Sequence, residues 1–245
     1  MFWVKTISVF TWILAVDCTI PSYIKVCSKN DPHIDVCIKE SISYLRPQLA
    51  SGIPELDVPS LEPLVIDHFQ VNSGRDQARI NLGVNDVKIW GASKFDITEV
   101  KVDEAQLSFF VKVLIPHLYF EATYDLDMQM LVLSYKGKGP MSGNLTDMVL
   151  TFQLNGEIIN KNGVQYLHFP RVKNGMTLGK IEMSFGDEKF KSEVLGKGIN
   201  QVLMENGDMI AEQFAPGLAE ACEGLFTDIG NHITEAFPYE ELFPL

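Results

Sequence analysis

Basic residues are scarce in this chain of 245 residues. Twenty Lys and Arg stand against 32 Asp and Glu, which gives a formal net charge of −12. Nucleic acids and anionic membrane surfaces are bound through basic faces, so this charge argues against both as partners. Hydrophobic residues still make up 46% of the chain, which is enough for a full core and too many for a disordered protein. A mixed or all-β chain of this length is often a single domain.

Long apolar runs are also absent, apart from a short one at the N-terminus. Lys5 precedes an apolar stretch from Ile7 to Val16, which is too short to cross a bilayer core of about 30 Å as a helix. A basic residue followed by a short apolar stretch is typical of a secretory signal peptide. We therefore expect residues 1–18 to be removed and residues 19–245 to be exported as one domain, without stable membrane insertion. The alternatives are cleavage after Asp17 and a short buried N-terminal element.

Cysteine occurs only four times. If Cys18 leaves with the signal peptide, Cys27, Cys37 and Cys222 remain. The exported compartment permits disulfides, and a bridge between Cys27 and Cys37 would close a short loop worth about 2–3 kcal/mol. We expect Cys222, left alone, to act as a small apolar residue on a helix face. No metal site is predicted, because the cysteines form no CxxC pair and the five histidines are scattered.

Sharp catalytic and cofactor motifs are missing as well. The chain has no H-E-x-x-H zinc helix, no phosphate-binding G-x-x-x-x-G-K-[ST] loop and no dinucleotide-binding G-x-G-x-x-G after a strand. The stretch 139–143 comes nearest to the serine-hydrolase motif G-x-S-x-G, but its spacing is wrong. We therefore predict no cofactor and no enzymatic activity, and keep a secreted lipid-ester hydrolase as the alternative.

One modification signal is present. Asn144-Leu145-Thr146 is an N-glycosylation sequon. We predict glycosylation at Asn144, which requires this residue to be exposed. The alternative, an unmodified asparagine at the start of a strand, stays open at this point.

Helical signals follow the N-terminal region. Asp31 can accept hydrogen bonds from free N–H groups and Pro32 suits the first helical position, so a helix is predicted to begin here. Apolar residues then recur at spacings of three and four, at Ile34, Ile38, Ile42, Leu45 and Leu49. Gly52 is predicted to end this helix. The stretch 53–63 contains three prolines and is predicted to be an extended connector.

From Leu64 to Phe185 the apolar period changes to two. Alternation is clearest in four runs, which begin at Leu107, Leu118, Met148 and Ile181. Turn signals separate the runs, at Asn72–Gly74, Gly137–Pro140, Asn155-Gly156, Asn162-Gly163 and Asn174-Gly175. Closely spaced strands joined by such turns predict antiparallel hairpins with one buried face.

After Gly186 the period returns to 3.6, and one apolar stripe runs through residues 187–236. This pattern predicts a C-terminal helix far longer than usual, kinked at Pro216 because proline removes an internal hydrogen bond. A long helix with an apolar stripe must bury that stripe, and the apolar face of the sheet is the available partner. We therefore expect an α+β domain in which the sheet curves around the helix.

The large apolar side chains between sheet and helix are the candidate ligand site. They are Phe109, Phe120, Tyr124, Phe152, Tyr166, Phe169, Met183, Phe185, Phe214 and Leu218. For any one of them, ordinary core packing is the commoner role. A cavity is favoured by the small residues of the helix, which are Ala211, Ala215, Gly217, Ala219, Ala221 and Cys222. An apolar void of ligand size binds apolar ligands, and Tyr124 and Tyr166 are our candidates for orienting them.

Several stretches of the chain resemble one known family. They are Ile20-Pro-Ser-Tyr-Ile24, Cys27-Ser-Lys-Asn-Asp-Pro32 closing at Cys37, Leu45-Arg-Pro47, Gly52-Ile-Pro-Glu-Leu56, Leu61-Glu-Pro-Leu64 and the terminal Pro238-Tyr-Glu-Glu-Leu-Phe-Pro244. On these motifs the chain resembles the takeout-like branch of the insect haemolymph juvenile hormone binding protein superfamily. The similarity runs over nearly the whole chain after the signal peptide.

The resemblance implies a TULIP-like fold, with a long helix wrapped by a strongly curved antiparallel sheet that encloses a hydrophobic tunnel. It implies an extracellular carrier, in haemolymph or another fluid, for juvenile hormone, a terpenoid or a fatty-acid-like lipid, with roles in circadian, feeding or chemosensory physiology. Cys27 and Cys37 match the family disulfide. The second cysteine pair of true hormone binders is missing, since Cys222 is alone, and this favours the takeout-like branch.

Two further interpretations of function stay open beside the carrier. One is the lipid-ester hydrolase, which would lose turnover on changing one serine or carboxylate. The other is a signalling factor that binds a protein without any ligand. A cell-surface receptor that recognises the loaded carrier is a related partner.

Overall fold

The computed structural model describes residues 20–75, 78–130, 133–186 and 207–245. The predicted signal peptide, with Cys18, and residues 187–206 of the predicted C-terminal helix lie outside this part. The described elements, in chain order, are α1 (Ile34–Ser51), η1 (Pro54–Leu56), β1 (Leu64–Arg75), β2 (Ala78–Trp90), η2 (Ala92–Lys94), β3 (Asp96–Asp103), β4 (Ser108–Met130), β5 (Leu133–Asn155), β6 (Glu157–Lys161), β7 (Val164–His168), β8 (Val172–Thr177), β9 (Ile181–Phe185), α3 (Gly207–Thr234) and α4 (Tyr239–Leu242).

Helix α1 ends as predicted but begins two residues later than Pro32. The Asp31 carboxylate accepts the backbone N–H of His33 at 2.8 Å, and the Ile34 N–H donates to the Asp31 carbonyl at 3.2 Å. Asp31 therefore stabilises a turn that leads into the helix, where the sequence predicts a cap of the helix itself. Gly52 follows the last helical residue with a φ of 83°, a left-handed value that glycine adopts at low cost.

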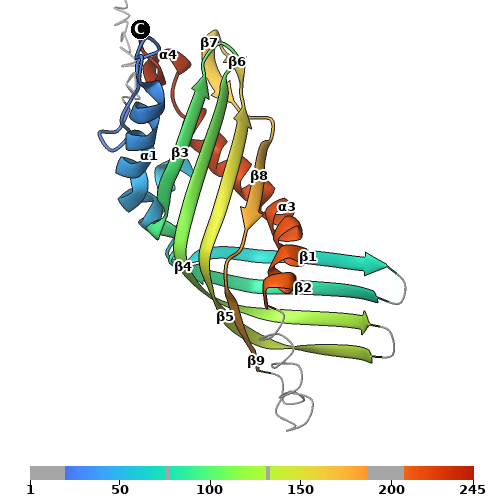
Figure 1. Cartoon of the computed structure of the whole chain (residues 1–245). Helices are drawn as coiled ribbons and strands as arrows, with labels where there is room; N and C mark the ends of the chain where they lie inside the picture. The colour runs from blue at the N-terminus through green and yellow to red at the C-terminus, as the bar shows by residue number, and fades with distance from the viewer. Residues whose placement is uncertain (1–19, 76–77, 131–132, 187–206) are drawn as a thin grey trace, which may run out of the picture.

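The predicted disulfide is present. Cys27 and Cys37 are bonded, with Cα atoms 5.9 Å apart, and they tie the segment before α1 to its first turn. The C-terminal segment packs beside it. The N–H of Cys27 donates to the carbonyl of Leu242 at 3.4 Å, and the N–H of Lys29 donates to the carbonyl of Pro244 at 2.9 Å. The C-terminus thus lies next to the start of α1 (Figure 1).

The sheet confirms the predicted antiparallel architecture. It has seven strands in the order β1-β2-β4-β5-β8, with β3 also pairing with β4 and β9 with β5. The hairpin β6–β7 forms a separate two-stranded sheet. We call the part with β3 and β8 the upper half and the part with β1, β2 and β9 the lower half, after their places in Figure 1. Strands β4 and β5 run through both halves and bend between them (Figure 1).

Strand β4 joins two runs that the sequence pattern separates. Odd-numbered residues are buried up to Ile115 and even-numbered ones from Leu118 onward, and the two residues between them are exposed. Ile115 and Leu118 nevertheless pack in the same core cluster. In β5, opposite this step, Asp147 has a positive φ of 52°. The two-residue step therefore lets one continuous strand bend while it keeps its apolar side toward the core.

The turn predictions are confirmed in part. Asn155-Gly156 separates β5 from β6, and Asn162-Gly163 joins β6 to β7 with the positive φ values of a two-residue hairpin. The other three signals, at Asn72–Gly74, Gly137–Pro140 and Asn174-Gly175, are wrong because they lie inside β1, β5 and β8. Arg75 pairs with Ala78 and Met130 with Leu133. Cross-strand pairing thus continues past the predicted turns and overrides local propensity.

The core forms three clusters. The upper cluster joins α1, β3, the upper parts of β4 and β5, and α3 around Leu49, Val113 and Leu150. The end cluster gathers around Phe109, Leu167, Phe169 and Val172, next to the hairpin β6–β7 and the C-terminal segment. The lower cluster centres on Val84, Val87, Ala122, Tyr124 and Met141. All members described for it come from strands, so helices cover only the upper half of the described structure extensively.

Candidate functional site

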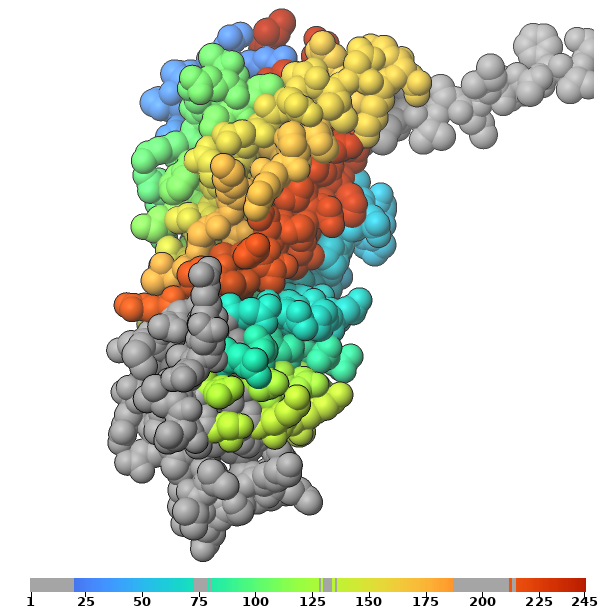
Figure 2. Space-filling model, turned by 90° about the vertical axis from the view of Figure 1, so that its right-hand side faces the viewer, coloured from blue at the N-terminus to red at the C-terminus, as the bar shows by residue number. Residues whose placement is uncertain are grey.

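Helix α3 contacts edge strands of both halves of the sheet. It contacts β8 most extensively and β1 next, with further contacts to β7 and β9. Figure 2 shows its outer side as a band between β8 and β1. The inner side carries Leu218, Phe226, Ile229 and Ile233, which pack in the upper cluster. The helix is thus positioned by its apolar stripe, and the candidate site is the apolar interior between α3 and the sheet.

Small residues let α3 approach the sheet closely. Ala215 and Ala219 are buried. A Cβ added at Gly217 would lie 3.0 Å from Cγ1 of Val71 in β1, closer than nine in ten such contacts. At Gly217 the absent side chain therefore serves close packing of helix on strand, a different role from the unfilled volume that the sequence analysis expects.

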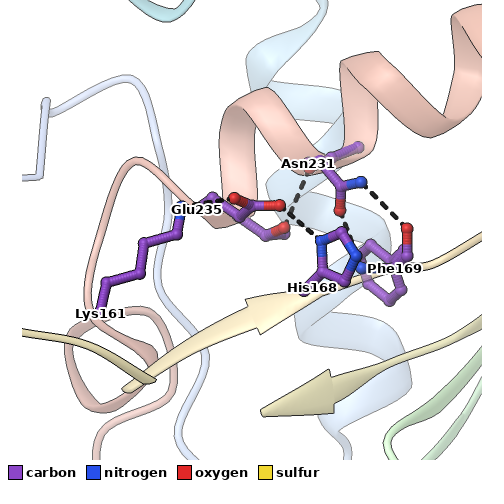
Figure 3. A network of polar contacts seen from close by, with 7 residues as sticks. Lys161, His168, Phe169, Asn231 and Glu235 are labelled. Atoms are coloured by element: carbon purple, nitrogen blue, oxygen red, sulfur yellow. Dashed lines mark hydrogen bonds and ion pairs between the residues drawn. The ribbon is translucent and has the colours of Figure 1, made fainter. Parts of the chain in front are cut away.

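A polar stripe that the sequence analysis missed fixes α3 to the chain around β7 and β8. Its residues recur every four positions, at Glu223, Thr227 and Asn231 of α3 and at Glu235, the residue that follows the helix. The Asn231 amide accepts the backbone N–H of Phe169 at 2.8 Å and donates to the Phe169 carbonyl at 3.0 Å (Figure 3). Thr227 accepts the N–H of Val172 at 3.0 Å. These side chains thus satisfy the backbone groups of Phe169, between β7 and β8, and of Val172, the first residue of β8.

The first and last residues of the stripe, Glu223 and Glu235, form ion pairs. Glu223 forms a two-pronged ion pair with Arg171. Glu235 lies 2.6 Å from the Lys161 ammonium and 2.6 Å from Nδ1 of His168 (Figure 3). Partial burial alone would raise the pKa of Glu235, but hydrogen bonds from Lys161 and His168 outweigh it and hold that pKa below its ordinary value. Glu235 therefore links the C-terminal end of α3 to the hairpin β6–β7 through ion pairs.

The predicted ligand residues fall into two groups. Phe109 and Phe169 meet edge to face in the end cluster, with ring centroids 5.9 Å apart. Phe152 meets Phe226 of α3 in the same way at 4.8 Å. In the lower half Tyr124 and Phe185 meet edge to face at 5.0 Å, and Phe120 packs beside them. The described members of the predicted set thus lie in two aromatic groups, one in each half.

The remaining predicted residues have mixed positions. Leu218 packs in the upper cluster, and Met183 is half-buried in β9 opposite Gly143. Tyr166 lies in the hairpin β6–β7, outside the three clusters, with the Lys161 ammonium 5.5 Å from its ring centre. Phe214 belongs to α3, but its side chain is outside the described part. Tyr166 is therefore not grouped with Tyr124, its expected partner in orienting a ligand.

Charged side chains are at most partly buried in the described structure. No polar or charged residue among the described ones is fully buried. Three buried side-chain atoms of the described residues nevertheless lack a hydrogen bond, namely Nε of Arg46, Oε1 of Gln48 and Oδ1 of Asn174. The Asn174 NH2 donates to the Ala219 carbonyl at 2.9 Å, which fixes the amide, and its register partner in β5 is Phe152. Asn174 therefore offers an unused acceptor beside the aromatic group of the upper half.

Cys222 lies in α3 as a free, half-buried cysteine. Burial raises the pKa of its thiol to about 11, so the reactive thiolate is scarce at neutral pH. Within the described ranges no group of three or more His, Cys, Asp and Glu is placed to hold a metal ion. None of the described helices combines the length and the apolarity needed to cross a membrane.

Comparison with known proteins gives three informative matches. The chain is 25% identical over 235 residues to the circadian clock-controlled protein daywake of Drosophila melanogaster, covering 91% of this chain and 88% of daywake. It is 26% identical over 148 residues to the "Putative beta-carotene-binding protein" of Schistocerca gregaria, covering 59% and 57% of the two chains. Takeout 1 of Epiphyas postvittana superposes with a TM-score of 0.76 at 17% identity, over 91% of this chain and all of that one.

The structural match shows the same fold, an antiparallel sheet with a long C-terminal helix. The resemblance found in the sequence motifs is confirmed at the level of the family. The family model of the haemolymph juvenile hormone binding proteins matches residues 7–244, which is nearly the full length. This chain belongs to the haemolymph juvenile hormone binding protein family, with relatives of the takeout type.

Proposed function

We propose that this protein is a secreted carrier that binds a small hydrophobic ligand in a tunnel between α3 and the sheet. The observation that carries the proposal is the apolar interior beside α3, in which no described polar or charged residue is fully buried and which α3 borders by contacting both β8 and β1. Removing apolar ligand surface from water drives binding at about 25 cal/mol per Å². A ligand that buries about 300 Å² would gain roughly 7 kcal/mol before the ordering costs of association. No catalytic step is part of the proposal.

The ligand we propose is neutral, such as a terpenoid or a carotenoid. An ionised fatty acid would bury its carboxylate in an interior where no described cationic residue is fully buried, which is costly. The similarity to a protein named for beta-carotene binding supports a polyisoprenoid skeleton. For a ligand of this class that carries a hydroxyl, such as a terpenoid alcohol, we propose that Oδ1 of Asn174 accepts the hydroxyl's hydrogen bond, because a buried acceptor without a partner costs about 1–3 kcal/mol.

The place of action that we propose is extracellular fluid such as haemolymph. The family name, the predicted signal peptide 1–18 and the disulfide between Cys27 and Cys37 support export. The net charge of −12 keeps a loaded carrier soluble and away from anionic membranes. The similarity to a clock-controlled protein supports a role in circadian physiology.

The test is a titration with a fluorescent apolar probe, N-phenyl-1-naphthylamine, on matched variants of α3. Phe226→Asp places a charge in the interior, whereas Ala221→Asp places the same charge on the exposed side of the same helix. We expect Phe226→Asp to weaken probe binding at least tenfold and Ala221→Asp to leave it unchanged. Phe214→Asp, chosen from the sequence alone, should also abolish loading. Equal binding by all variants, or turnover of an ester probe, would contradict the proposal.

A further inference from the structure

The N-glycosylation sequon is a motif that the carrier function does not use. Asn144-Leu145-Thr146 is the one Asn-x-Ser/Thr triplet in the chain. Asn144 lies in β5, opposite Tyr119 of β4 on one side and Glu182 of β9 on the other. Leu145, the next residue, packs in the upper cluster. Because successive strand residues face opposite sides of a sheet, Asn144 faces the outer side.

The Asn144 amide is free to carry a sugar. No described residue hydrogen-bonds this side chain, and its atoms are not among the buried polar atoms that lack a partner. Its neighbours across the strands, Tyr119 and Glu182, are half-exposed and exposed. A glycan attached here would therefore extend into solvent without displacing the fold. Attachment takes place on the extended chain during export, so pairing of β5 in the folded protein does not oppose it.

Two aromatic rings lie in the same row of the outer face. Trp90 of β2 is the register partner of Tyr119, and their ring centroids are 5.6 Å apart. The Tyr119 hydroxyl donates to the Glu121 carboxylate at 2.9 Å, which fixes the direction of the ring along β4. The order across the sheet is thus Trp90, Tyr119, Asn144 and Glu182. Both rings are half-exposed, and a half-exposed aromatic pair next to a sequon offers a surface that an apolar sugar face can cover.

We propose that Asn144 carries an N-linked glycan whose first N-acetylglucosamine packs against Tyr119 and shields Trp90. In the transfer, the Asn144 amide nitrogen forms a bond to C1 of the sugar and gives up one proton. The bond from C1 to the diphosphate of a lipid-linked oligosaccharide breaks, and the lipid diphosphate leaves with the electron pair. Packing of the first sugar against Tyr119 then removes apolar surface of both the sugar ring and the tyrosine ring from water.

The first test asks whether the site is modified. The full chain is placed behind a heterologous secretion signal and secreted from insect cells, and the peptide that contains Asn144 is analysed by mass spectrometry. Thr146→Ser keeps the sequon, whereas Thr146→Val removes it with little change in shape. We expect a glycan in the wild type and in Thr146→Ser, and none in Thr146→Val. A bare Asn144 in the secreted wild type would overturn the proposal, whatever the outcome of the ligand-binding tests.

The second test asks whether the sugar sits on the aromatic pair. Substitution of Trp3 and Trp12 by phenylalanine leaves Trp90 as the one tryptophan. We expect acrylamide to quench Trp90 at least twofold more efficiently in Thr146→Val than in the glycosylated protein. Tyr119→Leu should reduce this difference, whereas Tyr119→Phe, which keeps the ring, should preserve it. Equal quenching with and without the glycan would contradict the proposed packing of the sugar against Tyr119 and its shielding of Trp90.

Discussion

The upper and lower halves of the sheet are stabilised in different ways. In the upper half, α1 and α3 cover the strands, a disulfide ties the start of α1, and the polar stripe of α3 binds the backbone around β7 and β8. In the lower half, the described apolar cluster consists of strand residues alone, and α3 touches it mainly along β1. Among the described residues, helix packing and polar anchoring are thus concentrated in the upper half.

The largest expected difference between the halves concerns aromatic side chains. Phe169 is 3% exposed in the end cluster, and Phe169→Ala should lower the free energy of unfolding by about 3–5 kcal/mol. Phe185 is only half-buried in the lower half, so Phe185→Ala should lower it clearly less. Urea denaturation of both variants checks this difference. Equal losses would show that the two halves are packed alike.

The polar stripe gives the next effect. Asn231→Leu keeps the size of the side chain but leaves the N–H and carbonyl of Phe169 without their partner. Because each buried backbone group left without a partner costs about 1–3 kcal/mol, we expect a loss of about 2–6 kcal/mol in the free energy of unfolding. Asp228→Asn, on the exposed side of α3, is the matched control and should change it by less than about 0.5 kcal/mol. A loss no larger than the control's would mean that the stripe does not anchor the helix.

The smallest effect concerns acid. The pKa of Glu235 lies below its ordinary value in the folded protein, so the unfolded state binds the proton more readily. Its contribution to stability is therefore complete above a pH of about 4.3, the ordinary glutamate value, and is lost as the pH falls through the lowered folded pKa. Glu235→Gln should remove this part of the acid sensitivity. The check is the melting temperature of both proteins as a function of pH across the acid range. Parallel curves for the two proteins would contradict a stabilising role of the Glu235 carboxylate.

The sequence predicts the sheet well and its turns poorly. The change of period predicts strands from Leu64 to Phe185. In the structure, Leu64 is the first residue of β1 and Phe185 is the last residue of β9. The break in period after Ile115 marks a bend inside β4, because a two-residue step changes which residues face the core. Period alone cannot distinguish such a step from the end of a strand. Three glycine-containing turn signals failed because long cross-strand pairing outweighs local preference.

The sequence predicts the chemical character of the candidate site but not its geometry. It identifies the apolar residues of sheet and helix, yet the structure divides them into the group around Phe109 and Phe169 and the group around Tyr124 and Phe185. Grouping depends on strand register, which one sequence does not fix. The stripe at Glu223, Thr227, Asn231 and Glu235 could have been found, because polar residues at a spacing of four within an apolar helix indicate a specific contact. The free acceptor of Asn174 could not, because it depends on the place of the Ala219 carbonyl.

Native mass spectrometry of the protein secreted from insect cells tests the carrier account most directly. We expect a one-to-one complex with a neutral apolar molecule, which denaturation releases and organic extraction recovers for identification. Protein that arrives free of any such molecule, and that then takes up neither a carotenoid nor a terpenoid alcohol, would contradict the account.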